Sequence, residues 1–535
     1  MSERSRSPLA GPAPVGTRRW NRELGDAAVP RMTASARLSH ATMTQLPPSV
    51  ARPHYDLSSI RTGIVHLGLG AFHRAHEAVY TDAGLAADPG WGILGVSPRS
   101  PDTRDALAPQ DWLYTLVERD ASGTRLRVIG ALTGVLVASE NPRELISRMA
   151  APAVRIVSLT VTEKGYCRAA ASGDLDETNP AIRHDLANPD APQSVHGMLL
   201  AAVRARRAAG VPPFAALSCD NLPANGATLG RVLMQFAALQ DRELARWIDE
   251  KVAFPSCMVD RIVPATRPED RAHVSAALGV KDAWPVITEP FTQWVIEDRF
   301  PAGRPRWEDA GATMVPDVHP WEQMKLRLLN GSHSNIAYLG QLAGWATVPE
   351  AIGEPLLAAH IRALMAEVIP TLSLPASVDL SAYCDTLMQR FANPALQDRT
   401  ARIAEDGSQK LPQRLLEPAR VLLARGRPPV RIALGLAAWI RFCGGRADDG
   451  TALPLIDPRA DSLRALASGA PDPQKQVMAM LNLPDLGSGD LTTHDDFIML
   501  IAAALRSLAV AGVRTTLRAW PADTARARHA RDTIA

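Results

Sequence analysis

Gly63-Ile-Val-His-Leu-Gly68-Leu-Gly70-Ala-Phe-His73-Arg-Ala-His76 is the stretch that decides the fold. A short apolar run enters a Gly-x-Gly turn, and apolar residues at helical spacing follow through Val79. The pattern predicts a strand, a tight turn and a helix, an arrangement that lets the backbone approach a pyrophosphate while helix N–H groups point at it. His73 replaces the third glycine of the G-x-G-x-x-G fingerprint, so the motif alone fits a purely structural turn equally well.

The segments that follow alternate between strand-like and helix-like patterns. Apolar runs occupy residues 91–96, 154–162 and 213–218, and residues 198–209 have helical spacing. Strands that alternate with helices are typical of a parallel sheet covered on both faces. We therefore predict an α/β protein with a Rossmann-type doubly wound sheet in its N-terminal domain, and ligands at the C-terminal ends of the strands.

The residues after the second predicted strand bear on the choice of cofactor. NAD favours an acidic residue there, which bonds the ribose hydroxyls. The sequence reads Ser97-Pro-Arg99-Ser100-Pro-Asp102. Arg99 and Ser100 would accommodate the 2'-phosphate of NADP, whereas Asp102 would serve the ribose of NAD if the turn is tight. The choice between the two cofactors stays open on these residues.

Polar side chains follow two later apolar runs directly, as expected at the ligand edge of an open sheet. The first set is Asn221 and Asn225, for which ordinary turn chemistry is the alternative. The second set is Asp260 and Arg261, for which the alternative is a local ion pair.

Length and composition set the class of protein. At 535 residues the chain is long enough for several domains, and 46% hydrophobic with 21% charged residues is typical of a soluble globular protein. Its 58 basic and 56 acidic residues are interspersed and leave a net charge of +2, so nothing points to nucleic acid or a membrane surface. Five scattered cysteines without a C-x-x-C pair favour a reducing compartment, and we expect a cytoplasmic protein without structural zinc.

Three regions are predicted along the chain. Residues 1–56 are rich in Arg, Ser, Pro and Ala, lack the apolar core of a secretory signal, and are expected to be a disordered tail, with the true start codon open. Residues 57–314 form the dinucleotide-binding domain, and residues 315–525 form an α-helical substrate domain. Its long helical segments begin with residues 321–342 and include residues 380–391. No apolar run approaches the roughly 18 residues of a membrane helix, so no span is expected. The oligomeric state stays open.

The segment Lys325-Leu-Arg-Leu-Leu-Asn330-Gly-Ser-His333 combines an amine, a carboxamide and an imidazole in apolar, helix-like sequence. At about 100° per residue, the three side chains fit within an arc of about 140°. Burial among leucines would lower the pKa of the amine towards that of a general base. The rise from Lys325 to His333 is about 12 Å, so either the helix begins after Lys325 or the ligand is long. The alternative is a lysine whose stem packs on the helix while its amine stays in water.

Other common catalytic arrangements do not occur in the sequence. No His-x-x-x-His, C-x-x-C or comparable cluster supports zinc, and none of the six tyrosines has a lysine four residues later. No G-x-x-x-x-G-K-[ST] occurs, which argues against a kinase or ATPase. Lys325 is therefore the candidate base of a nicotinamide oxidoreductase. The alternative from another class is a non-catalytic nucleotide-binding interaction protein that docks through its helical domain.

With these residues laid out, the sequence resembles the polyol-specific long-chain dehydrogenase (mannitol dehydrogenase) family over residues 63–522. The motifs lie at 68–76, 162–166, 218–221, 258–262 and 325–333. The resemblance implies a metal-independent transfer of hydride between NAD(H) and a sugar acid or polyol, by a Rossmann-type domain followed by a helical one. Segments 162–167 and 406–414 are more similar to the fructuronate reductases (D-mannonate oxidoreductases) of the family, and mannitol 2-dehydrogenase activity on D-mannitol and D-fructose is the alternative.

The resemblance also implies roles for individual residues. Lys325 is expected to be the general base, with Asn221 and Asn330 as the oxyanion hole. His333 and Asp260 are expected to orient the substrate, and Glu322 to pass the proton of the base to solvent. Arg402, Lys410 and Lys164 are candidates for binding a uronate carboxylate. The expected cofactor contacts are Gly68, Gly70, Ala71, Phe72, His73, Arg74, Thr160 and Glu163.

Overall fold

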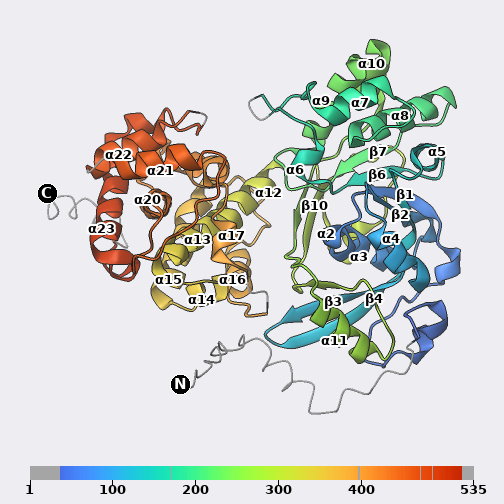
Figure 1. Ribbon diagram of the computed structural model, residues 1–535, viewed down its shortest axis with the longest axis horizontal. Helices are drawn as coiled ribbons and strands as arrows, with labels where there is room; N and C mark the ends of the chain where they lie inside the picture. The colour runs from blue at the N-terminus through green and yellow to red at the C-terminus, as the bar shows by residue number, and fades with distance from the viewer. Residues whose placement is uncertain (1–35, 170–171, 396–397, 470–471, 485, 521–535) are drawn as a thin grey trace, which may run out of the picture.

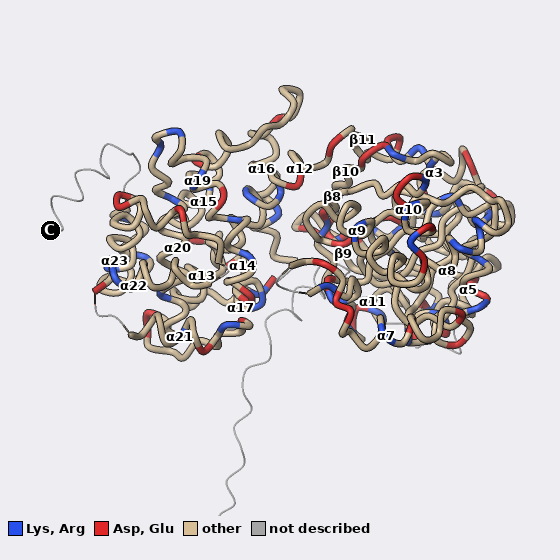
Figure 2. The backbone as a smooth tube through the Cα atoms, turned by 90° about the horizontal axis from the view of Figure 1, so that it is seen from above, with Lys and Arg blue, Asp and Glu red and all other residues tan. Residues whose placement is uncertain are grey.

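The computed structural model describes residues 36–169, 172–395, 398–469, 472–484 and 486–520. The described chain forms two lobes (Figure 1): a lobe of strands and helices, coloured blue to green, and a lobe of helices, coloured yellow to red. Basic and acidic residues are mixed over both lobes (Figure 2), as their interspersed order in the sequence indicates.

The centre of the first lobe is a five-stranded sheet in the order β5-β2-β1-β6-β7, with all neighbours parallel. Its strands are β1 (Thr62–Leu67), β2 (Gly92–Ser97), β5 (Leu132–Val137), β6 (Ile156–Leu159) and β7 (Ala215–Ser218). The chain begins in the middle, moves outwards to β5 and then returns to β6 beside β1. This is the strand order of a Rossmann-type sheet, with its switch point between β1 and β6. The predicted fold class is confirmed.

Helices cover both faces of this sheet, so successive residues of a strand enter different cores. Val65 and Leu67 pack with residues of α5 (Pro142–Ala150), α8 (Val195–Ala208) and α9 (Asn225–Ala238). Ile64 packs on the other face, in the core that contains Trp294 and Trp307. Because both faces are covered, the strands are apolar at nearly every position and read as continuous apolar runs. Further helices of this lobe are α2 (Ala71–Ala75), α3 (Glu77–Gly84), α4 (Asp102–Leu107), α6 (Thr162–Gly165), α7 (Pro180–Ala187), α10 (Arg242–Lys251) and α11 (Pro268–Leu278).

Two three-stranded sheets that the sequence did not predict complete the first lobe, in the orders β4-β3-β9 and β11-β10-β8. Their strands are β3 (Tyr114–Asp120), β4 (Gly123–Ile129), β8 (Cys257–Asp260), β9 (Val286–Thr288), β10 (Gln293–Glu297) and β11 (Thr313–Val315). Several of these strands have only three to five residues, too few to show a clear period. Strands β8 and β9 nevertheless position two carboxylates of the site described below.

The region predicted to be a disordered tail is folded from residue 36 onwards, while residues 1–35 lie outside the described part of the chain. Leu38, Leu46 and Val50 are buried in a core shared with β3, β4 and α11. The prediction was wrong for residues 36–56 because their apolar side chains are too widely spaced to show a pattern. Each of them gains its partners only from segments distant in sequence.

The second lobe is helical, as predicted. It begins with α12 (His319–Met324), a π-helical segment η6 (Lys325–Asn330) and α13 (Gly331–Ala343), which together correspond to the first predicted helix. The helices that follow are α14 (Val348–Ile352), α15 (Pro355–Val368), α16 (Leu380–Phe391), α17 (Thr400–Ile403), α18 (Gly407–Leu411), α19 (Glu417–Ala424), α20 (Val430–Cys443), α21 (Ala460–Gly469), α22 (Pro473–Leu481) and α23 (Asp495–Ala519). They share one core, in which α13 packs directly against α20.

Helix α23 has the length and composition of a membrane span, with 25 residues and a mean hydropathy of 1.8 in its most apolar window, although the sequence predicted no such segment. Half of that window is buried inside the protein, in the core shared with α20 and α22. Gly512, with a φ of 72°, also interrupts the helix. These features are those of a core helix with a kink near its end.

Gly435→Ala is expected to lower the free energy of unfolding by about 1–3 kcal/mol, because packing strain follows when a side chain is forced into a filled core. A Cβ at this position of α20 would lie 2.4 Å from Oδ1 of the buried Asn335 on α13. Urea unfolding followed by circular dichroism measures the effect. Gly84→Ala is the control, since a Cβ at Gly84 in α3 has no atom within 4 Å. Equal stability of Gly435→Ala and wild type would contradict the close approach of α13 and α20.

Candidate active site

The glycine-rich turn follows β1 at the switch point of the parallel sheet. Gly68 has a φ of 97°, and a Cβ there would lie 2.1 Å from the carbonyl oxygen of Thr160, so this position requires glycine. Gly70 is exposed and precedes helix α2, and the nearest atom to a Cβ built on it is 3.8 Å away. The backbone of the turn is therefore open to a pyrophosphate group, as a dinucleotide site requires.

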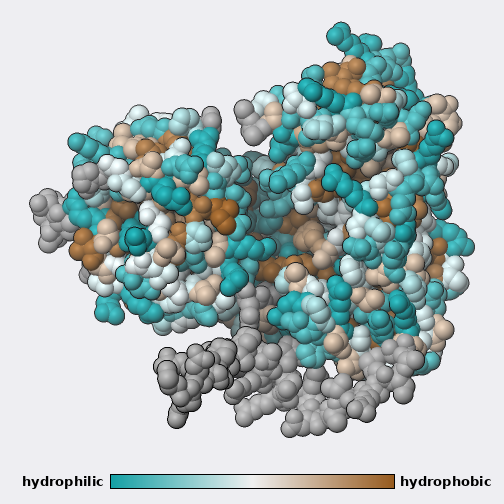
Figure 3. Space-filling view, viewed as in Figure 1, coloured by the Kyte–Doolittle hydropathy of each residue, from teal (hydrophilic) through white to brown (hydrophobic). Residues whose placement is uncertain are grey.

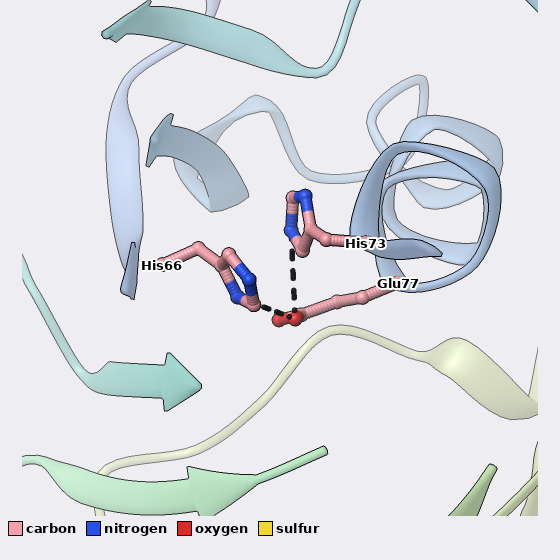
Figure 4. Close-up of side chains that lie close together, drawn as sticks. All are labelled: His66, His73 and Glu77. Carbon is pink, nitrogen blue, oxygen red and sulfur yellow. Dashed lines mark ion pairs between the residues drawn. The ribbon is translucent and has the colours of Figure 1, made fainter. Parts of the chain in front are cut away.

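Three buried side chains, His66, His73 and Glu77, form a cluster next to this turn (Figure 4). Their polar atoms lie within 4.8 Å of one another, which is near enough for metal ligands. The two imidazole rings are stacked, however, with centroids 3.5 Å apart and planes 24° apart. An imidazole nitrogen presents its lone pair in the plane of the ring, so two stacked rings do not direct their lone pairs at one ion. We interpret the cluster as internal support for the turn.

The predicted cofactor-binding residues divide into two groups. Gly68, Gly70 and Ala71 form the open turn and the first residue of α2, and Phe72 follows them, half-buried against His76. The hydroxyl of Thr160 donates to the carbonyl oxygen of Gly68 at 2.8 Å and so holds the turn from β6.

The side chains of His73 and Arg74 are buried, whereas that of Glu163 is exposed. His73 is fully buried in the cluster, and the Arg74 guanidinium is buried and donates to the carbonyl oxygen of Trp284. Neither side chain is available to a ligand at the surface of the turn. Both side chains point from the short α2 into the interior of the lobe. Glu163 is exposed on α6.

Lys325 is buried between the two lobes, where its ammonium group donates to Asn221 Oδ1 at 2.8 Å and to the carbonyl oxygen of Val259 at 2.7 Å. Both acceptors belong to the first lobe. Burial lowers the pKa of Lys325, and the charges of Arg390 and Arg414 lower it further, against the opposing effect of Asp260. The alternative of a lysine with its amine in bulk water is therefore wrong. A buried amine with a lowered pKa is suited to accept a proton.

The lysine is the first residue of the π-helical segment η6, and α12 precedes it. The alternative in which the helix begins after Lys325 is therefore wrong. Hydrogen bonds in a π-helix join residues five apart, so Lys325 and Asn330 share a face, whereas an α-helix would separate them by about 140°. Such segments are frequent at functional sites. Here it places Lys325 and Asn330 on the same side of the helix.

The two amides complement the lysine. Oδ1 of Asn221 accepts from Lys325, so the Nδ2 group of Asn221 is left to donate to a ligand. Oδ1 of Asn330 is buried and has no hydrogen-bond partner in the described part of the chain. A buried polar atom without a partner points to a bond made by a ligand, and a flip of the amide would offer a donor at the same place.

Asp260 does not pair with Arg261, as the local alternative predicted, but with Arg390 of the helical lobe. Two bonds of 2.7 and 3.1 Å join Arg390 to Asp260, and two of 2.7 and 2.9 Å join it to Glu289 after β9. Burial alone would raise the pKa of Asp260, but Arg390 outweighs it and holds that pKa below its usual range. Arg261 instead pairs with Glu118 at 2.6 Å. Asp260 thus lies beside the lysine, within its electrostatic reach, as a charged group.

His333 and Glu322 lie on either side of η6. Burial lowers the pKa of His333 to about 3, and the charges of Arg390 and Arg414 act in the same direction, so its imidazole is neutral. Its ring packs against Phe391, with centroids 4.8 Å apart. Glu322 accepts from the backbone N–H of Ala224, and burial raises its pKa to about 7, which suits a group that exchanges a proton with solvent.

The three cations predicted to bind a substrate carboxylate are either exposed or already bonded within the protein. Lys164 is exposed on α6 of the first lobe. Arg402 is 75% exposed and faces Asp398 at 3.5 Å. Lys410 is half-buried, and its ammonium donates to the carbonyl oxygen of Glu405 at 2.6 Å.

The space-filling view shows a hollow between the two lobes, with apolar residues inside it (Figure 3). A small pocket at this junction is lined by residues of both lobes, among them Ile262, His333, Arg390 and Phe391. The site is therefore a cleft between domains, as expected for an enzyme that holds two ligands together.

Sequence reasoning missed three residues of this site. Arg390 stands near the end of a helix whose bounds, residues 380–391, were predicted, but a basic residue there reads as an ordinary charge on a helix end. Glu289 follows a three-residue strand. Arg414 lies in segment 406–414, but only the three-dimensional arrangement shows that no carboxylate among the described residues pairs with it.

A Rossmann-type sheet with an open glycine turn, joined to a helical lobe that supplies a buried lysine, defines a two-domain dehydrogenase. Comparison with known proteins identifies its kind. Residues 62–309 match the mannitol dehydrogenase Rossmann domain, and residues 317–509 match the mannitol dehydrogenase C-terminal domain. The chain belongs to the mannitol dehydrogenase family.

Individual relatives cover most of the chain. D-mannonate oxidoreductase of Escherichia coli (strain K12) is 45% identical over 479 residues, which are 88% of this chain and 98% of that protein. Mannitol 2-dehydrogenase of Cereibacter sphaeroides is 42% identical over 475 residues, 88% of this chain and 98% of that protein. The structure of Pseudomonas fluorescens mannitol 2-dehydrogenase, a ternary complex with NAD and D-mannitol, has 42% identity and a TM-score of 0.78, and the match covers 90% of this chain and 99% of that one.

Arg390→Met is expected to lower the free energy of unfolding by about 3–5 kcal/mol, because it leaves Asp260 and Glu289 buried without a counter-charge. Urea unfolding measures the change. Arg362→Met is the matched control: its ion pair with Asp385 also involves α16 but is exposed, so little change is expected. A loss no larger than that of the control would contradict the structural role of Arg390.

Proposed function

We propose that this protein is an NAD-dependent oxidoreductase that interconverts D-fructuronate and D-mannonate, with Lys325 as its general base. The observation that carries the proposal is the buried amine of Lys325, held by Asn221 and the Val259 carbonyl at the ligand edge of a dinucleotide fold. A docking protein, the alternative from another class, has no need of a buried amine with a lowered pKa.

The cofactor proposal rests on the open turn at Gly68 to Ala71 and on the NAD bound in the Pseudomonas fluorescens relative. NAD supplies the acceptor for the hydride in alcohol oxidation and its donor in ketone reduction. Arg99 and Ser100 are exposed after β2, and Asp102 opens α4, so both the acidic and the basic options lie near the expected ribose position. NAD is the cofactor we propose, and NADP is tested beside it.

Each residue of the cleft has its own role in proton transfer. Lys325 accepts the hydroxyl proton of the substrate, and the amides of Asn221 and Asn330 stabilise the negative charge that grows on the oxygen. His333, as a neutral imidazole, and Asp260 orient the remaining hydroxyl groups. Glu322, with its raised pKa, passes the proton to solvent. We propose that no metal ion takes part, as the resemblance to the family implies.

The uronate is proposed as substrate because the Escherichia coli D-mannonate oxidoreductase matches over nearly its whole length at 45% identity. Oxidation of D-mannitol is the second candidate, since mannitol 2-dehydrogenases match at 41–42%. For the location we propose the cytoplasm, on the scattered set of five free cysteines.

Lys325→Ala is expected to reduce kcat by about 1000-fold, the usual contribution of a general base, while the affinity for NADH stays near that of wild type. Absorbance assays of NADH at 340 nm measure kcat, and fluorescence titration with NADH measures the cofactor affinity. Lys251→Ala, which removes an exposed lysine at the end of α10, is the control. Near-normal turnover of Lys325→Ala would remove the proposed base.

The pH dependence of the two directions is expected to be opposite. Alcohol oxidation needs the neutral amine, so its rate rises with pH through the pKa of Lys325, which burial places below the usual lysine value of 10.5. Ketone reduction needs the protonated amine and falls over the same range. Glu322→Gln is measured alongside, because Glu322 itself titrates at about 7. The same profile in Lys325→Ala as in wild type would contradict the assignment.

The substrate is tested with purified enzyme and both cofactors against D-fructuronate and D-fructose. We expect kcat/KM to be at least about 100-fold higher for the uronate, since hydrogen bonds to a charged group commonly contribute that much discrimination. A ratio near one or below rejects the uronate and favours the mannitol alternative.

A further inference from the structure

Arg414 is a cation within electrostatic reach of Lys325 and His333, and the described residues provide no carboxylate partner for it. It lies in a second π-helical segment, η8 (Pro412–Leu416), which packs against η6. A Cβ on Gly331, the residue after η6, would lie 3.1 Å from the carbonyl oxygen of Arg414. The absence of a side chain at Gly331 therefore lets the two π-helical segments approach each other closely.

The guanidinium of Arg414 has unused donors. Its Nη1 group donates to Ser334 Oγ at 3.1 Å and approaches the carbonyl oxygen of Asn330 at 3.5 Å. Its Nε and Nη2 groups form no hydrogen bond within the described part of the chain. A guanidinium binds a carboxylate through two parallel N–H groups, and the pair Nε and Nη2 is such a fork.

The positive charge of Arg414 affects the pKa values of residues in the site. Burial lowers the pKa of Arg414 to about 10, which leaves it protonated at neutral pH. Its charge in turn lowers the pKa of both Lys325 and His333. Arg414 is only partly exposed, and a charge held largely away from water is unfavourable unless it is paired. An arginine without a counter-ion among the described residues therefore points to an anion supplied by a ligand.

The other cations near the cleft already have partners or are exposed. Arg390 is saturated by Asp260 and Glu289. Arg402 faces Asp398 at the surface, and the ammonium of Lys410 is bonded to a backbone carbonyl. Arg414 is thus the better candidate for an anionic group of the substrate.

We propose that Arg414 binds the carboxylate of a sugar-acid substrate and thereby determines the preference for an acid over a neutral ketose. The proposal rests on the function proposed above, whose substrate carries its carboxylate at the opposite end of the chain from the reacting carbonyl. Lys325 is the first residue of η6, and Ser334, the residue bonded to Arg414, lies in the first turn of the following helix α13. A long ligand along η6 and the start of α13 is therefore held at both ends, with Asn330 and His333 between them.

The test is the variant Arg414→Met, which keeps the volume of the side chain and removes its charge and donors. The KM for D-fructuronate is expected to rise about 100-fold, because two charge-assisted hydrogen bonds are lost. Its kcat should change by less than about 10-fold, since the carboxylate is remote from the reacting carbon and its binding is uniform through the reaction. The kcat/KM for D-fructose, compared on the low-pH plateau where Lys325 is protonated in both proteins, should stay within a few-fold of wild type. Arg427→Met, which removes an exposed arginine of the same lobe, is the control and should change neither substrate.

Equal losses on both substrates, or an unchanged KM for D-fructuronate, overturn the proposal. If Arg414→Met does not fold, Arg414→Lys carries the test, because it keeps the charge without the fork. Its KM for D-fructuronate should then rise about 10-fold with D-fructose unaffected, and an unchanged KM again overturns the proposal. A wild-type enzyme that prefers D-fructose instead rejects the proposed function, and this result is seen without any variant.

Discussion

The ion pair of Arg390 with Asp260 and Glu289 joins the two lobes at the floor of the cleft, and the geometry of the site depends on it. Asp260 ends β8, one residue after the Val259 carbonyl that holds Lys325, and Arg390 lies on α16 beside the Phe391 ring that contacts His333. The four bonds of 2.7–3.1 Å thus hold the two lobes, whose hydrophobic cores are separate, in one relative position. Desolvation of three charges is tolerated because each has a bonded partner of opposite sign.

The two π-helical segments add a second constraint. Segment η6 turns Asn330 onto the face of Lys325, and η8 carries Arg414 towards the end of η6. π-helical turns are rare and are frequent at functional sites, in agreement with the place of η6 at Lys325. The two segments pack against each other, with a close backbone approach at Gly331, so the position of Lys325 and the position of Arg414 depend on the same contact.

The sequence predicted the parts of the fold whose pattern is local. Continuous apolar strands and the glycine turn indicated the parallel sheet, and helical spacing gave α16 with the bounds the structure has. The folded segment 36–56 and the two small sheets were not predicted, because the segments they pair with are distant in sequence. Lys325, Asn221 and Asn330 could be named from motifs, but Arg390 and Arg414 could not be assigned. Their significance lies in which charges they face, and a linear pattern does not contain that information. His73 shows the converse: a residue inside the strongest motif is buried behind the turn.

The charges of the cleft connect substrate choice to the acidity of the base. Asp260 raises the pKa of Lys325, but Asp260 is also paired with Arg390. Arg414 lowers the pKa of Lys325, and no described carboxylate pairs with Arg414. An anion bound to Arg414 would offset that effect and move the pKa of Lys325 upwards, whereas a neutral polyol would leave it low. A protonated lysine serves ketone reduction and a neutral one serves alcohol oxidation. The carboxylate of a bound sugar acid would therefore favour the protonated form of Lys325. This is the form that reduction of a keto acid requires.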